Sequence, residues 1–180
     1  FTKVNDKLKK EILDITYGTL NFIVNGCPYE KLNIKIKKEN LEILENDRKR
    51  FIQSKILFKP NSVPATIVWN EKKIKSRIRI KGDLLNNWNF KKKFSLKITL
   101  DKPYTINGMS EFSLTKFAER QFPVNLIISE QLSDHDIIVP KFHSYKVNFD
   151  NSNWGLMLAE EQFSAFYYSS RSIDKNPILK

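Results

Sequence analysis

The chain has 180 residues, and its 31 Lys and Arg against 20 Asp and Glu give a formal net charge of +11. Hydrophobic residues make up 41% of the chain, which is enough for a packed core and excludes global disorder, while no apolar run reaches the ~18 residues of a transmembrane helix. Cys27 is the single cysteine, so an internal disulfide framework and a thiolate zinc cluster are excluded.

The N-terminal segment predicts a helical extension over residues 1–31. Apolar residues recur at helical spacing within residues 4–17, but Lys-rich flanks make this a peripheral helix. The chain begins at Phe1 without a methionine and stops soon after an Asn-Pro pair, without a capping element. We therefore expect it to be a piece of a longer protein.

The first strand and the first long helix are predicted in the next forty residues. Residues 31–37 alternate apolar and polar side chains, the period-2 pattern of a half-buried strand. Asn40 can cap a helix after this strand, and one stripe of the helix is apolar apart from a single arginine. That stripe is formed by Leu41, Leu44, Arg48, Phe51 and Ile52.

A strongly basic hairpin is predicted in the middle of the chain. Residues 65–70 read as a strand, residues 70–72 as a turn, and residues 73–81 and 93–100 as two further strands with one apolar and one cationic face. Residues 71–97 hold ten Lys and Arg against two acids, so most of the net charge is concentrated here. Such a concentration of charge can attract phosphate or another anion.

The remaining elements complete an α+β pattern. Turns at 102–103 and 107–108 precede a short buried piece at 112–114, a helix at 122–132, and strands at 142–149 and 154–159. The predicted order is β-α-βββ-α-ββ. It indicates an α+β domain over residues 32–180, with an antiparallel-rich sheet and a helix packed on it.

Familiar catalytic and nucleic-acid motifs are absent. The chain has neither a GxxxxGK[ST] nor a GxGxxG sequence, and His135 and His143 lack an HExxH context. Residues for a zinc, helix-turn-helix or RNP module are missing too, so sequence-specific recognition of nucleic acid is not expected.

The order of several weaker motifs resembles the CotH family, the spore-coat-protein-H-like atypical protein kinases. The likeness runs from residues 77–83 (RIRIKGD) and 92–97 (KKFSLK), through residues 106–114 (INGMSEFSL) and the helix around 127–132, to residues 145–148 (YKVN) and 155–163 (GLMLAEEQF). It covers roughly residues 32–175, and its specificity comes from the ordered set of motifs at family-like separations.

The resemblance implies a function. CotH-like proteins are similar to protein kinases, and the family transfers the ATP γ-phosphoryl group, with Mg or Mn, to Ser residues of secreted or surface proteins. It also implies a bacterial, extracytoplasmic or surface-associated location, and a kinase-like fold whose N-terminal lobe is an antiparallel sheet with one helix. The family's metal-binding and catalytic acids would lie in a C-terminal lobe beyond residue 180. We therefore expect no catalytic or metal-ligating residue in this chain, and no kinase activity from it alone.

Six residues would contact or support the nucleotide if the resemblance holds. Gly82 would lie near the phosphates with Lys81 beside it, and Lys97 would grip the phosphates, with Lys93 on the same strand face as its rival. The alternative for Lys97 and for Lys93 is a lysine that lies on a solvent-exposed strand face and binds no ligand.

The last two of these residues lie in the second half of the chain. Glu130, in the helix, would pair with the phosphate-gripping Lys, although an exposed helix carboxylate is the alternative. Glu161 would begin the hinge that contacts adenine, with Gln162 and Phe163 after it. Met157 replaces the usual Tyr of the family's last motif, and Asp83 replaces a small polar residue after Gly82.

Two other interpretations remain open from the sequence. The basic hairpin, with Trp88 and Phe90 in its tip, is also typical of a module that binds a polyanion by charge and stacking. The other is a structural or scaffold protein of an extracytoplasmic layer that uses a kinase-like fold without catalysis.

Overall fold

The computed structural model describes residues 29–54, 56, 58–82, 93–116, 124–135 and 137–172. The chain divides into two units after Glu30, and all the helices and strands named below belong to the unit Lys31–Lys180. They are β1 (Lys31–Lys35), α2 (Lys38–Ser54), β2 (Val63–Trp69), β3 (Lys72–Ile80), β4 (Leu96–Leu100), β5 (Glu111–Thr115), α4 (Val124–Asp134), β6 (Phe142–Phe149), β7 (Ser152–Glu161) and α5 (Ala165–Ser169). The helix expected within residues 4–17 and the hairpin tip with Trp88 and Phe90 lie outside the described residues.

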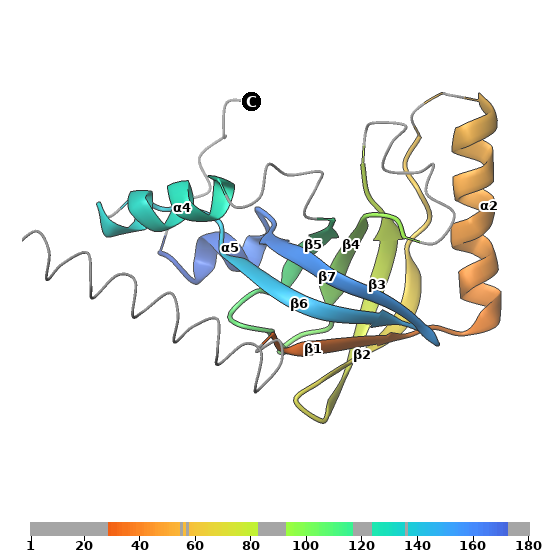
Figure 1. Cartoon of the computed structure of the whole chain (residues 1–180), viewed down its shortest axis with the longest axis horizontal. Coiled ribbons are helices and arrows are strands. Elements are labelled where there is room, and N and C mark those ends of the chain that lie inside the picture. The colour runs from red at the N-terminus through yellow and green to blue at the C-terminus, as the bar shows by residue number, and fades with distance from the viewer. Residues whose placement is uncertain are drawn as a thin grey trace, which may run out of the picture. The chain divides into compact units, whose positions relative to one another are not determined.

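The strands close into a seven-stranded barrel in the order β1-β2-β3-β4-β5-β7-β6 (Figure 1). Six pairs of neighbours are antiparallel, and the seventh, between β1 and β6, is parallel, with Leu32 opposite Val147. The sequence-based fold class is therefore wrong: the sheet is not the open, antiparallel sheet of an α+β kinase N-lobe with a packed helix. Because β1 bonds β2 on one side and β6 on the other, the barrel has no free edge strand among the described residues.

The apolar face predicted for residues 73–81 fills the inside of the barrel. Ile74, Ile78 and Ile80 of β3 are buried, and Ser76, on the same face, satisfies its hydroxyl by donating to the carbonyl oxygen of Ala65 at 3.1 Å. Each buried Ile contributes about 1.5–3 kcal/mol relative to an exposed one. The Lys and Arg residues between them point outward, so the outer face of β3 is cationic.

Tight turns connect antiparallel neighbours. Asn70 and Glu71, between β2 and β3, have φ of 46° and 64°, and Asn107 and Gly108 have φ of 47° and 73°. Two successive residues with positive φ form the turn that matches the twist of a hairpin. The turn expected at residues 107–108 is thus present, between the bridged residues Ile106 and Met109.

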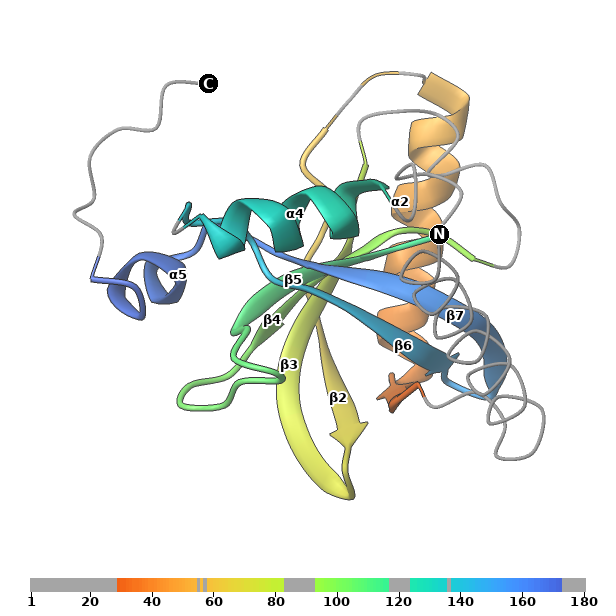
Figure 2. The same ribbon diagram turned by 60° about the vertical axis from the view of Figure 1, so that its left-hand side comes forward.

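The helices lie outside the barrel. α2 covers β2 and β3 with Leu44 and Phe51, two residues of its predicted stripe. In Figures 1 and 2, α2 runs along one side of the barrel, while α4 and α5 lie toward the other end. The sequence does not predict α5, which begins after Ser164, whose hydroxyl accepts the backbone N–H of Tyr167 at 3.1 Å. Among the described residues, no helix is long and apolar enough to cross a membrane.

Candidate functional site

A single row of paired residues crosses five strands on the outer face of the barrel. Arg79 pairs with Lys97, Lys97 with Ser113, Ser113 with Glu160, and Glu160 with Phe142. Directly paired residues point to the same side of a sheet, and the alternate residues of these strands fill the core. The row therefore changes from cationic at β3 and β4 to acidic at β7 and apolar at β6.

Lys81 meets the end of β7 beside this row. Its Nζ lies 3.4 Å from Oε1 of Gln162 and 4.0 Å from Oε2 of Glu160. Ser113 belongs to β5, which lies between β4 and β7, and it is fully buried. Its hydroxyl accepts a hydrogen bond from Nε2 of Gln162 at 3.4 Å and donates one to Oε2 of Glu160 at 3.5 Å. Lys81, beside the predicted phosphate loop, and Gln162, in the predicted hinge, are therefore in contact.

Gly82 follows Lys81 with a φ of 132°, in a region that L side chains rarely adopt. The backbone N–H of Lys81 donates to the carbonyl oxygen of Ser95 at 2.8 Å, which extends the pairing of β3 and β4 beyond Ile80. The pairing of β3 and β4 thus reaches Lys81, and Gly82 follows it directly.

Lys97 takes a different partner from the one that the resemblance implies. Its Nζ forms an ion pair with Oε2 of Glu111 on β5 at 2.5 Å, and the two side chains are 25% and 23% exposed. Glu130 is exposed on α4 and makes no ion pair in the described part of the chain. The structure does not bring Lys97 and Glu130 together.

Lys93 lies away from this row. The ammonium group of Lys93 lies beside Gly155, because Nζ is only 3.5 Å from the position that a Cβ would take at this glycine. The Lys93 side chain therefore reaches the early part of β7. Glu160 is five residues further along the strand, about 17 Å at the usual rise. Lys93 is therefore not grouped with Lys81 and Gln162.

Glu161 follows Glu160 in β7, so the two side chains point to opposite faces of the strand. The Glu161 side chain is 2% exposed. Its Oε2 accepts from Nη2 of Arg171 at 2.5 Å, its Oε1 accepts from Nη1 at 3.2 Å, and the N–H of Lys141 donates to Oε2 at 3.1 Å. The guanidinium of Arg171 also lies 4.0 Å from the centre of the Tyr167 ring. Glu161 thus anchors the segment around α5, and its partner Arg171 is a residue that the sequence alone does not single out.

Burial raises the pKa of the Tyr167 phenol, and the negative charge of Glu161 acts in the same direction, while the positive charge of Arg171 opposes the shift. The phenol is therefore neutral over the physiological pH range. It serves as a packing surface for Arg171, since the ring is buried.

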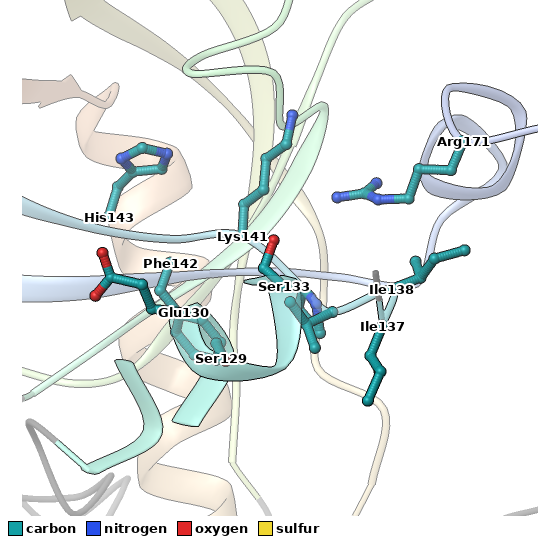
Figure 3. A pocket seen from close by; sticks show the side chains of 11 residues that line it. Ser129, Glu130, Ser133, Ile137, Ile138, Lys141, Phe142, His143 and Arg171 are labelled. Atoms are coloured by element: carbon teal, nitrogen blue, oxygen red, sulfur yellow. The ribbon is translucent and has the colours of Figure 1, made fainter. Parts of the chain in front are cut away.

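Glu130 lines a separate pocket of about 690 Å³ between α4, residues 137–143 and Arg171. Figure 3 shows Glu130 and His143 on one side of this pocket and Arg171 on the other, with Lys141 between them. Its walls include Ile137 and other apolar residues, which makes it a mixed polar and apolar pocket of ligand size. Phe142 belongs both to this pocket and to the outer row.

The chain matches no protein-family model, and a comparison with curated proteins finds no match either. Within the described ranges, no three or more His, Cys, Asp or Glu residues are grouped to hold a metal ion. The site is therefore characterised by its own geometry: a cation, an amide and a carboxylate that converge from two distant segments.

Proposed function

We propose that the chain is the nucleotide-binding part of a CotH-like atypical protein kinase. Such an enzyme would transfer phosphate from ATP, with Mg or Mn, to Ser of a surface or secreted protein. One observation carries the proposal: Lys81 contacts Gln162, 81 residues further along the chain. The two segments that the resemblance assigns to the phosphates and to the hinge meet at one place on the outer face.

The groups at this place suit phosphate binding. The ammonium group of Lys81 lies 4.0 Å from Oε2 of Glu160, and a phosphate oxygen can form a shorter, charge-assisted hydrogen bond with such a group. Gly82 allows the backbone to approach a ligand closely. Arg79, in the adjacent row, adds positive charge. Phosphoryl transfer depends on positioning and on such charges more than on covalent chemistry of the protein.

The support for this function comes from the outer-face residues around Lys81 and from the motifs, and not from the fold, because the barrel is not a kinase-lobe sheet. It assigns no catalytic residue and no metal ligand to this chain. The purified chain is expected to bind ATP without transferring phosphate to a generic protein substrate.

Calorimetric titration with ATP and Mg tests the proposal. Lys81→Met should weaken binding about tenfold, the effect of losing a charge-assisted hydrogen bond. Lys73→Met is the matched control, since Lys73 lies on the outer face of the same strand, away from Gln162. It should change affinity less than about twofold. Equal losses in the two variants would contradict the assignment.

A second candidate function is a non-catalytic, polyanion-binding module. The cationic outer face of β3 favours it. In that case heparin-like polymers should bind with a steep dependence on salt, and every outer-face Lys or Arg change should weaken binding by a similar factor. Titration of the same variants with heparin separates the two functions.

A further inference from the structure

A second cavity, of about 370 Å³, opens on the outer face at the basic end of the row. Three parts of the chain form it: the loop that leads from α2 to β2, strand β3 and strand β4. Its cationic lining consists of Lys59, Arg77, Arg79 and Lys97, and the hydroxyl-bearing Thr99 lies with them. Lys81 and Gln162 do not line this cavity.

The positive charge around the cavity is mostly unbalanced. Glu111 pairs with Lys97, whereas Lys59, Arg77 and Arg79 have no carboxylate partner among the residues that the structure describes. The cavity thus keeps about three unneutralised charges within a small volume. Such an arrangement raises the local concentration of anions.

The loop wall of the cavity is held in place from two sides. Asp47 of α2, only 5% exposed, accepts the backbone N–H of Asn61 at 2.6 Å and its side-chain Nδ2 at 2.8 Å. Arg77 donates to the carbonyl oxygen of Ser62 at 2.5 Å. A ligand would therefore meet a wall that is already ordered, which lowers the conformational cost of binding.

We propose that this cavity binds a phosphate group. A phosphate dianion can accept from the planar fork of Arg79, from the flexible ammonium of Lys59 and from the hydroxyl of Thr99. The volume lies near the lower end of the range for ligand pockets, about 300–1,000 Å³, and suits one phosphate with a few attached atoms. The phosphate can belong to a free anion such as pyrophosphate or to a phosphorylated serine side chain. This inference does not depend on the nucleotide site at Lys81.

Calorimetry on the full chain tests the proposal with four ligands: inorganic phosphate, pyrophosphate, a phosphoserine peptide and the same peptide without phosphate. Arg79→Gln should weaken binding of the phosphate ligands about tenfold. Lys73→Gln, which removes one charge from the same face of the same strand outside the cavity, should change it less than about twofold.

The ligands identify the source of the phosphate. Tighter binding of pyrophosphate than of the phosphoserine peptide indicates a free anion, and the reverse order indicates a modified side chain. No binding of any phosphate ligand at about 50 mM salt, equal binding of the unphosphorylated peptide, or equal losses in Arg79→Gln and Lys73→Gln would overturn the proposal. Circular dichroism checks that Arg79→Gln is folded; if it is not, Lys59→Gln, in the exposed loop, replaces it with the same expected loss.

Discussion

Glu161 and Arg171 form an ion pair with two contacts, at 2.5 and 3.2 Å, although they belong to different elements and Glu161 is almost completely buried. The backbone N–H of Lys141 binds the same carboxylate. The pair therefore connects the end of β7, the start of β6 and the segment after α5. A carboxylate that is buried to this degree depends on its partners, because an unpaired buried charge is strongly unfavourable.

Arg171→Ala should lower the free energy of unfolding by about 3 kcal/mol, since it leaves the Glu161 carboxylate buried without its cation. Urea unfolding measures this value. Lys146→Ala, an exposed change on β6, is the control and should stay within about 0.5 kcal/mol of the wild type. A loss below about 1 kcal/mol for Arg171→Ala would mean that solvent compensates for the missing guanidinium.

Ionisation of the Tyr167 phenol should lower the free energy of unfolding of the protein at alkaline pH. Its pKa is raised in the folded state above the ordinary value of 10.0, chiefly by burial. The stability from the neutral phenol is fully present below about pH 10, and it is lost as the pH rises through the folded-state pKa, because the unfolded chain ionises first. Tyr167→Phe should remove this part of the alkaline loss, as seen in urea unfolding at a series of pH values. Identical alkaline slopes for the two proteins would contradict the shift.

Asp47 fixes the loop that leads into β2. Asp47→Ala removes two hydrogen bonds to Asn61 and should lower the free energy of unfolding by about 2 kcal/mol. Glu42→Ala, an exposed change on the same helix, should have little effect. If the loop wall matters for the cavity beside it, Asp47→Ala should also weaken pyrophosphate binding at a temperature where the variant is fully folded. Unchanged stability would show that the loop is held by other contacts.

Much of the local structure could be predicted from the sequence. The alternation in residues 73–81 and 142–149 indicates strands β3 and β6, and for β3 it also indicates the inward face, because its apolar residues all lie on one side. The closure of the barrel could not be predicted. Alternation shows which side of a strand is buried, but it does not show that β1 pairs with β6, more than a hundred residues away. The sequence also predicts β5 only as a short buried piece, whereas it is a full member of the barrel.

The candidate site shows the same division between local and long-range information. The resemblance points to Lys81 and Gly82 at the end of a basic strand, and also to Glu161 and its neighbour Gln162. Nothing in the sequence indicates the partner of Lys97, because Glu111 begins β5 without a distinctive charge pattern around it. In the register that pairs Lys97 with Ser113, Glu111 is paired with Thr99. Glu111 is therefore a diagonal neighbour of Lys97 on the same face of the sheet. Only the register of β4 and β5 reveals this proximity.

A double-mutant cycle decides which carboxylate acts with Lys97. The ion pair with Glu111 is partly exposed, so Lys97→Met and Glu111→Gln should show a coupling energy of about 0.5–1 kcal/mol in unfolding experiments. Lys97→Met and Glu130→Gln should be additive within about 0.5 kcal/mol, because the two residues do not meet. The same cycles measured by ATP titration extend the test to function. If Lys97→Met and Glu130→Gln couple in ATP affinity while Lys97 and Glu111 do not, the nucleotide-bound protein must bring α4 to β4, as the kinase resemblance implies. If Glu111 alone couples with Lys97 in both experiments, Lys97 serves the barrel surface and its neighbouring cavity, and the phosphates of a nucleotide are left to Lys81.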